Sequence, residues 1–383
     1  MKTVYFKSPT AYLIGNGEAK NLAVHLKKLG VSKCLLVTDS VIAKLGTAEA
    51  VMSPARTAGV EFIVFADCLP EPPVSNTYDA LALYQSHGCQ GVVGLGGGSS
   101  MDVAKAVAML ATNPGRYEDY AGVNKVPHRC APLVLMPTTS GTGSEVSMFS
   151  IMMVNGAKAG VCDQNITAHI ALVDPELTLT VPRKVTASTG LDTFCHLLEC
   201  YISRLATSMS DMIALEGIGY VCRYLRKAVG DPTNLEARYW MSYASSLGGF
   251  GPNLVDGCAA NHGLAFALGA VYHIGHGLAN ALVLPYVFPV VCKAELEKLP
   301  RLADAMGLNS QGKSLQEVSQ MISQAILDLV RDVGCLQPLS QFGATEDDLD
   351  RLVEETNFQT RVMGHSSWQL TSEEIRAIFV KAM

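Results

Sequence analysis

The sequence predicts an α/β domain over residues 1–180 and an all-helical domain over residues 181–383. In the first half, short apolar strand patterns alternate with helical patterns of roughly 10–15 residues, which is typical of a parallel, doubly wound sheet. In the second half, almost no strand pattern occurs, and helical patterns follow one another to the C-terminus. A chain of 383 residues is long enough for two domains of ordinary size.

The expected elements of the first half begin with a short N-terminal strand pattern, followed by a helix from about Glu18. Residues 171–190 resemble a connector interrupted by prolines, in which Pro182 is well placed to open a helix. The other expected strands are 33–40, 60–68, 91–95 and 133–136, and the other expected helices are 41–59, 78–89 and one from Met101 onward.

The second half is read as a series of helices separated by breaks at residues 230–232 and 307–308. The expected helices are 192–204, 209–229, 234–247, 259–268, 277–291, 294–306, 315–333, 346–355 and 372–383.

A glycine-rich turn, residues 96–100, joins the strand pattern at 91–95 to the following helix. Glycines let the backbone approach a bulky anion, and the start of a helix offers free N–H groups and the positive end of the dipole. The turn therefore indicates a pyrophosphate site, although a tight turn without a ligand is the alternative. The strict G-x-G-x-x-G spacing is absent, because Gly94 and Gly96 are followed by Ser99.

A second loop, rich in hydroxyl groups and glycine, follows the strand pattern at 133–136. Its side chains can donate hydrogen bonds to ribose, phosphate or carboxamide groups, or they can belong to a solvated loop. Both loops follow parallel strands, whose carboxyl ends border the crevice where α/β sheets bind ligands. The hydroxyl residues of the loop are Thr138, Thr139, Ser140, Thr142 and Ser144.

Four of the nine histidines fall in two short, otherwise apolar segments of the second half. Asp192 and His196 are four residues apart in a helical pattern, so both side chains lie on one helix face. His262, His273 and His276 follow further along the chain. Three imidazoles and a carboxylate suit a divalent transition metal such as Fe, Zn, Ni or Mn. Ordinary core or surface histidines are the alternative.

Composition and charge exclude several classes of function. The net charge of −6 without basic clusters excludes a nucleic-acid partner. No apolar run reaches about 18 residues without Gly, Pro or a charge, so we expect no membrane span. The N-terminus has no apolar signal region. The 11 cysteines form no C-x-x-C motif, which indicates a reducing compartment, and we expect the cytoplasm.

Four motifs together make the chain resemble the iron-containing (metal-dependent, group III) alcohol dehydrogenase family over nearly its whole length. They are GGGSSMDVAK at 96–105, PTTSGTGSEV at 137–146, STGLDTFCHLLECYIS at 188–203 and YHIGHGLANALVLP at 272–285. The resemblance implies a Rossmann-like NAD(P)-binding domain followed by an all-α domain, the architecture shared with dehydroquinate synthase. It also implies a divalent metal, most often Fe(II), with Asp192, His196, His262 and His276 as its ligands.

The resemblance further assigns residues of the first half to the cofactor. Asp39, at the end of the second strand pattern, is expected beside the adenosine ribose, where a carboxylate accepts from the 2′-OH and repels a 2′-phosphate. We therefore expect NAD rather than NADP, while Asp39 can also cap a helix. The implied contacts are Gly97, Gly98 and Ser99 to the pyrophosphate, Thr138, Thr139 and Ser147 near the nicotinamide, and Lys158 to a ribose.

The chain departs from the family pattern at three places. Phe266 stands where relatives often have a proton-relay histidine, so a relay would use His273, a ribose hydroxyl or water. The P-N-P loop of the family has Glu71 between its two prolines. Asp256 is an unusual acidic residue before His262, interpreted first as a helix cap and second as a contact to a polar substrate.

The predicted function is that of a metal-dependent, NAD(H)-linked alcohol dehydrogenase or aldehyde reductase. The expected substrate is a small primary alcohol or its aldehyde, with a polar or anionic tail as an option, and His273 and His276 are the expected catalytic residues. The alternatives are a dehydroquinate-synthase-like lyase, a glycerol-type polyol dehydrogenase and a non-catalytic nucleotide-binding protein. An N-terminal strand with Val4, Tyr5 and Phe6 is expected to pair in a homodimer.

Overall fold

The computed structural model describes residue 4 and residues 6–383, and these form two compact units. One unit comprises Lys7–Thr180, and the other comprises Val181–Met383 together with Val4 and Phe6. Val4 and Phe6 lie in no strand, Phe6 packs edge-on against Phe250, and Tyr5 is outside the described residues. The dimer through an N-terminal strand therefore stays a prediction.

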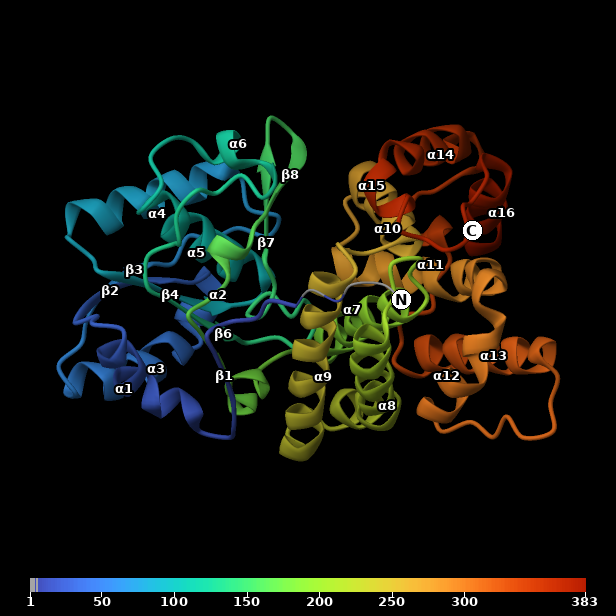
Figure 1. Ribbon diagram of the computed structural model, residues 1–383, viewed down its shortest axis with the longest axis horizontal. Helices are drawn as coiled ribbons and strands as arrows, with labels where there is room; N and C mark the ends of the chain where they lie inside the picture. Colours follow the sequence, from blue (N-terminus) through green and yellow to red (C-terminus); the bar gives the residue numbers. More distant parts are fainter. Residues whose placement is uncertain (1–3, 5) are drawn as a thin grey trace. The chain divides into compact units, whose positions relative to one another are not determined.

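The first unit is built on a six-stranded parallel sheet with the order β1-β9-β6-β4-β2-β3 (Figure 1). Alternate residues of β2 enter different cores: Leu35 and Val37 pack on one face of the sheet, and Cys34 and Leu36 pack on the other. Both faces are thus covered, as parallel sheets require. The strands are β1 (Ala11–Ile14), β2 (Lys33–Val37), β3 (Glu61–Phe65), β4 (Gly91–Gly96), β6 (Leu133–Pro137) and β9 (Ile170–Val173).

The helices of this unit connect the strands and cover the sheet. The pattern at 41–59 forms two helices, α2 and α3, because the chain turns at Gly46 with φ of 77°. The helix expected from Met101 begins at Gly98, so the last glycine of the loop lies in the first helical turn. The helices are α1 (Leu22–Lys28), α2 (Ser40–Lys44), α3 (Thr47–Thr57), α4 (Val74–Ser86), α5 (Gly98–Leu110) and α6 (Tyr117–Tyr120).

A second, three-stranded sheet and strand β9 were not predicted. The second sheet contains β5 (Gly122–Val123), β7 (Phe149–Val154) and β8 (Ala157–Cys162). Asn155 and Gly156 join β7 to β8 with φ of 51° and 81°, the positive values that a tight hairpin turn needs. The Asn-Gly pair was a readable signal for this hairpin. Residues 170–173 form a central strand, so the predicted connector is wrong there.

The second unit is helical, as predicted, and no strand occurs among its described residues. The first helix begins directly after Pro182, earlier than the expected start at Asp192. The helices are α7 (Arg183–Tyr201), α8 (Ser208–Gly230), α9 (Leu235–Leu254), α10 (Ala260–Tyr272), α11 (His276–Val291), α12 (Leu299–Ala305), α13 (Leu315–Asp332), α14 (Leu349–Phe358), α15 (Thr360–Met363) and α16 (Ser372–Ala382) (Figure 1).

Helices α7 and α11 form the centre of this unit, and glycines bring them close together. A Cβ on Gly277 would lie 2.6 Å from the carbonyl oxygen of Ser188, so only glycine lets the start of α11 approach α7.

By length and composition, the run His276–Ala305 is apolar enough to cross a membrane, but 61% of its most apolar window is buried inside this unit. Its apolarity is that of a core helix.

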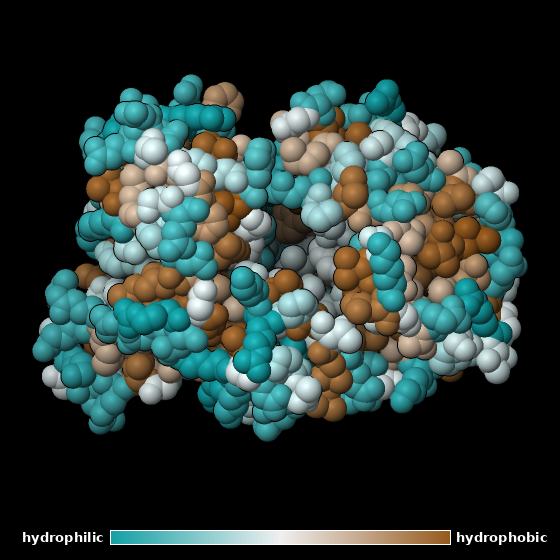
Figure 2. Space-filling model, turned by 180° about the vertical axis from the view of Figure 1, so that it is seen from behind, coloured by the Kyte–Doolittle hydropathy of each residue, from teal (hydrophilic) through white to brown (hydrophobic). Residues whose placement is uncertain are grey.

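Large apolar side chains that remain exposed are scattered over the surface. Val41, Met212 and Phe358 are the most exposed of them. On the face drawn in Figure 2, brown hydrophobic residues lie among teal hydrophilic ones. Scattered apolar groups of this kind are usual on folded proteins and indicate no particular partner.

Candidate active site

The second unit brings together the four side chains that the sequence singled out as metal ligands. Asp192 and His196 lie one turn apart on α7, His262 lies in the first turn of α10, and His276 is the first residue of α11. One donor atom from each lies within 4.8 Å of the others. The Oδ1 atom of Asp192 is 3.7 Å from Nε2 of His262 and 3.5 Å from Nε2 of His276.

This cluster fits a divalent metal ion. Nδ1 of His196 and Nε2 of His262 are buried and have no hydrogen-bond partner among the described residues. Buried polar atoms nearly always have a partner, so unpartnered nitrogens within a ligand cluster point to a bound ion. Burial would raise the pKa of Asp192, but the surrounding imidazoles and the Asn280 amide lower it, so the carboxylate is ionised. The donors are thus three nitrogens and one anionic oxygen.

Glu199 supports the cluster from one turn beyond His196, a role that the sequence analysis missed. Its Oε2 lies 2.5 Å from Nδ1 of His262, and its Oε1 accepts a hydrogen bond of 3.2 Å from the His262 backbone. The carboxylate keeps the proton on Nδ1, so Nε2 is left to bind a metal. A buried glutamate in the otherwise apolar run 197–202 was the available signal.

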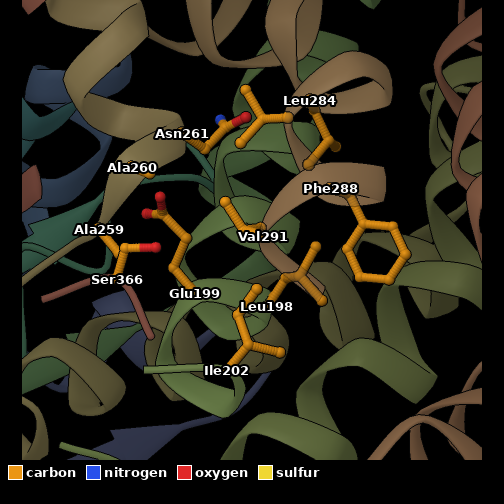
Figure 3. A pocket seen from close by; sticks show the side chains of 11 residues that line it. Leu198, Glu199, Ile202, Ala259, Ala260, Asn261, Leu284, Phe288, Val291 and Ser366 are labelled. Atoms are coloured by element: carbon orange, nitrogen blue, oxygen red, sulfur yellow. The ribbon is translucent and has the colours of Figure 1, made fainter. Parts of the chain in front are cut away.

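Apolar side chains surround this supporting carboxylate. Glu199 and Asn261 line a cavity of about 10 Å³, with Leu284, Phe288 and Val291 on its other side (Figure 3). A hydrogen bond in surroundings of low dielectric constant is stronger than one in water. The Glu199–His262 contact is therefore well suited to hold the imidazole in one orientation.

Asn280 supports the cluster from one turn beyond His276. Its amide donates a hydrogen bond of 2.9 Å to Oδ1 of Asp192 and lies 3.4 Å from Nε2 of His276. The amide of Asn261 in turn donates to the side-chain oxygen of Asn280 at 2.9 Å. Helices α7, α10 and α11 are thus joined by polar side chains behind the ligands.

Two residues close to the ligands in the sequence concern the expected proton relay. Phe266 lies one turn after His262 and stacks on the His276 ring, with centroids 5.5 Å apart. An apolar ring thus occupies the position of the family's relay histidine. His273 is exposed and ends α10 with a left-handed φ of 55°. Its predicted catalytic role stays a prediction.

Cys258 also lies beside the ligand cluster. Burial would raise the pKa of its thiol, but the His262 and His196 imidazoles lower it to about 7.

Nearby, Asp256 does not cap the start of α10, which is preceded by Ala259. It follows the C-cap of α9 with a left-handed φ of 60°, and the next N–H, of Gly257, donates to the Pro252 carbonyl at 2.9 Å, so Asp256 belongs to the C-terminal cap of α9. Its carboxylate forms an ion pair of 2.9 Å with Arg361.

The glycine loop of the first unit lies against the second loop. A Cβ on Gly97 would lie 3.5 Å from Oγ1 of Thr139, and one on Gly98 would lie 2.9 Å from Cγ2 of Thr142. The N–H of Thr138 donates to the carbonyl of Gly96 at 2.9 Å, which joins the loops. The loops therefore present bare backbone at the start of α5, where Ser99 lies in the first turn, and this fits a pyrophosphate group.

Asp39 fills one of its two expected roles, the helix cap, and its contact with the cofactor ribose stays a prediction. Its Oδ1 accepts hydrogen bonds from the N–H groups of Val41 and Ile42, so Asp39 does cap α2. Its Oδ2 lies 3.5 Å from where a Cβ on Gly96 would stand. One oxygen thus faces the glycine loop, in position to meet a ribose.

A buried lysine that the sequence analysis did not single out connects the two loops. Lys105 of α5 is fully buried and donates to Ser144 at 2.7 Å, to Ser147 at 3.0 Å and to the Phe149 carbonyl at 2.6 Å. Asp102, one turn earlier, accepts from Ser144 at 2.6 Å. Ser147, an expected nicotinamide contact, is therefore positioned by Lys105.

Lys158, the expected ribose contact on β8, forms an ion pair with Glu71. The two side chains are 2.7 Å apart, and Glu71 has a left-handed φ of 46°. The loop around Glu71 is anchored to β7, because Met153 donates a hydrogen bond to the carbonyl of Pro72. The residue that departs from the family pattern thus binds the lysine expected to meet the cofactor.

Comparison with known proteins identifies the family of this chain. The family model for iron-containing alcohol dehydrogenase matches residues 9–175, and that for the C-terminal part of the Fe-containing alcohol dehydrogenase family matches residues 186–383. Long-chain-alcohol dehydrogenase 1 of Geobacillus thermodenitrificans (strain NG80-2) is 36% identical over 372 residues, which cover 96% of this chain and 94% of the relative.

Two solved structures are similar over the whole chain. The crystal structure of a 1,3-propanediol oxidoreductase has a TM-score of 0.96 and 31% identity, with full coverage of both chains. Sulfoacetaldehyde reductase from Bifidobacterium kashiwanohense, solved in complex with NAD+, has a TM-score of 0.91 and 28% identity, with 100% of this chain and 99% of that chain covered. The predicted fold is confirmed, and the chain belongs to the iron-containing alcohol dehydrogenase family.

Proposed function

We propose that this protein interconverts a small primary alcohol and its aldehyde, with NAD(H) as hydride carrier and Fe(II) as the preferred metal. The observation that carries the proposal is the buried cluster of Asp192, His196, His262 and His276, in which two histidine nitrogens have no hydrogen-bond partner among the described residues. Zn(II), Mn(II) and Ni(II) suit the same donor types and are the alternatives.

The chemistry divides between the bound groups and the chain. A metal held by this cluster would supply Lewis acidity toward the substrate oxygen, and a bound nicotinamide would supply the hydride acceptor or donor. The chain orients the metal ligands, because Glu199 and Asn280 hold them by hydrogen bonds. The cluster opens on the side of His276, whose side chain is 30% exposed. Phe266 stacks on His276 and makes this side apolar, which helps to exclude water.

The proposed cofactor is NAD rather than NADP. Asp39 directs a carboxylate oxygen toward the glycine loop, and a carboxylate there favours a ribose 2′-OH over a 2′-phosphate. Gly97, Gly98 and Ser99 are the proposed pyrophosphate contacts. Thr138, Thr139, Ser147 and Lys158 are the remaining proposed cofactor contacts.

The proposed substrate is a small primary alcohol or its aldehyde, and a polar or anionic tail is the option that the aldehyde panel below decides. Similar proteins are named for a long-chain alcohol, 1,3-propanediol and sulfoacetaldehyde, so the shared feature is a primary alcohol or aldehyde group rather than one particular tail. We also propose that the protein acts in the cytoplasm as a homodimer.

The test is NADH oxidation by metal-free protein resupplied separately with Fe(II), Zn(II), Mn(II) or Ni(II). The aldehyde panel contains plain, hydroxylated, carboxylated and sulfonated members of similar length. We expect NADH oxidation that depends on the metal and is lost in His276→Ala. Activity of His276→Ala without bound metal would overturn the metal's role. A dehydroquinate-synthase-like lyase would give no net change in NADH, and a polyol dehydrogenase would favour the hydroxylated substrates.

A further inference from the structure

A second set of metal donors, which includes sulfur, lies beside the four-residue cluster. Cys258, Glu199 and His262 each offer one donor atom, and these three atoms lie within 4.8 Å of one another. His262 belongs to both sets. A thiolate is a soft ligand that favours ions such as Zn(II) and Cd(II), whereas the cluster of imidazoles and a carboxylate suits Fe(II) as well.

The turn that carries Cys258 is hydrogen-bonded to the C-terminal segment. Asp256 and Gly257 have φ values of 60° and 123°, so the chain reverses sharply just before the cysteine. Arg361 binds both the carboxylate of Asp256, at 2.9 Å, and its carbonyl oxygen, at 3.0 Å. Nδ1 of His365 lies 3.1 Å from the carbonyl oxygen of Cys258. The thiol is thus already positioned before any ion binds, which lowers the entropic cost of binding.

The other two donors are also in place and are shielded from water. Glu199 and His262 are 4% and 1% exposed, and Figure 3 shows Ala259, the residue after Cys258, beside the Glu199 carboxylate. Zn–S bonds of about 2.3 Å and Zn–N bonds of about 2.0 Å place donors roughly 3.5 Å apart. The three donors therefore need only small movements. On binding, Cys258 and His262 release their protons to solvent, as metal ligation in general requires.

We propose that Cys258, Glu199 and His262 form a second metal site for thiophilic ions, and that its occupation prevents metal binding at the four-residue cluster. Both sites need His262. If the two ions bound opposite nitrogens of the His262 imidazole, their two divalent charges would repel each other strongly, because the site is buried and has a low dielectric constant. The second ion would also remove Glu199 from His262 and so release the imidazole that the first ion needs. The inhibitory consequence rests on the proposed function, but the site itself does not.

Titration of metal-free protein with Cd(II) tests the site, because cadmium–thiolate coordination gives an ultraviolet charge-transfer band without any turnover. Cys222→Ser is the matched control, since Cys222 is likewise a partly exposed free cysteine but lies on α8. We expect the band in the wild-type protein and in Cys222→Ser, and its loss in Cys258→Ser. A band of equal size in Cys258→Ser would overturn the proposal.

A competition experiment tests the exclusion. Saturation with Fe(II) should weaken Cd(II) binding in the wild-type protein by roughly tenfold or more, and Cd(II) should weaken Fe(II) binding by the same factor. Independent binding of the two ions would overturn the exclusion. Fe(II) content of Cys258→Ser, measured by elemental analysis, shows whether this variant keeps its fold and the four-residue cluster.

The two proposals fail in distinguishable ways. A band that depends on Cys258, together with no NADH oxidation with any metal, would overturn the proposed function and leave the second site standing. Metal-dependent NADH oxidation, together with a band of equal size in Cys258→Ser, would overturn the second site and leave the proposed function standing.

Discussion

The metal cluster and the cofactor loops are built on different physical principles. In the helical unit, the site consists of side chains that three helices direct to one point, and buried polar groups such as Glu199 and Asn280 orient them. In the α/β unit, the proposed cofactor site consists largely of backbone that glycines leave bare, and the buried Lys105 holds it in place. We therefore expect the metal cluster to lose function when one of its side chains is removed. We expect the cofactor loops to lose function when a side chain is added to a glycine or when Lys105 is removed.

Removal of a metal ligand is the change with the largest expected effect. We expect His262→Ala to lower kcat/KM by roughly 10³-fold or more. A metal acting as a Lewis acid stabilises the transition state by several kcal/mol, and about 1.4 kcal/mol corresponds to a factor of ten in rate. Steady-state kinetics and elemental analysis of bound iron are the measurements. His87→Ala, at an exposed histidine in the other unit, is the control. Full activity of His262→Ala without iron would contradict the metal cluster.

Loss of the buried lysine should be the most damaging change in the α/β unit. Lys105→Met leaves the largely buried Asp102 without its cation, and breaking a buried pair in this way costs about 3–5 kcal/mol. We expect denaturant unfolding to show this loss, and the KM for NAD to rise because Ser147 loses its support. Lys105→Met combined with Asp102→Asn should recover part of the stability. Equal damage in the single and double variants would show that the pair is not coupled.

Weakening the support of a ligand should have a smaller effect than removing the ligand. Glu199→Gln keeps the size of the side chain but removes the charge that holds the proton on Nδ1 of His262. Changes to such supporting groups typically lower metal affinity by about 10–100-fold. We expect weaker Fe(II) binding in equilibrium titrations, with kcat largely restored at saturating metal. Unchanged affinity would mean that Glu199 has only a structural role.

Addition of one methyl group should impair the cofactor loops. In Gly98→Ala, the new Cβ would lie 2.9 Å from Cγ2 of Thr142, so the two loops must separate slightly. We expect the KM for NAD to rise by roughly tenfold, which corresponds to about 1.4 kcal/mol, with metal content unchanged. Gly230→Ala is the control, because its Cβ would meet no atom within 4 Å. An unchanged KM would show that the loops tolerate the side chain.

Glu71 offers the mildest test, because its ion pair with Lys158 is partly exposed. Glu71→Asn removes this ion pair and places a residue that tolerates positive φ at this turn. Since exposed pairs contribute about 0–1 kcal/mol, we expect the KM for NAD to fall by only about 2–5-fold, and less at high salt. Glu61→Gln, which breaks the exposed pair with Lys33, is the control. A higher KM would indicate that Glu71 itself binds the cofactor.

The sequence by itself determined the features that depend on neighbouring residues. The βα alternation, the helical second half and the glycine-rich turn at 96–100 follow from local patterns. The pairing of Asp192 with His196 follows from a spacing of four residues in one helix. The Asn-Gly turn at 155–156 is an equally local signal for the hairpin of β7 and β8.

The tertiary structure alone decided which distant residues act together. Glu199 meets His262 across 63 residues of chain, Asn280 meets Asp192 across 88, and Lys105 meets Ser147 across 42. Residues 170–173 are a short apolar run at the start of the predicted connector, and pairing with β1 and β6 makes them strand β9. Packing sets such contacts, and a single sequence carries no periodic signal for them. Only the folded chain therefore shows that Cys258 lies beside the metal ligands.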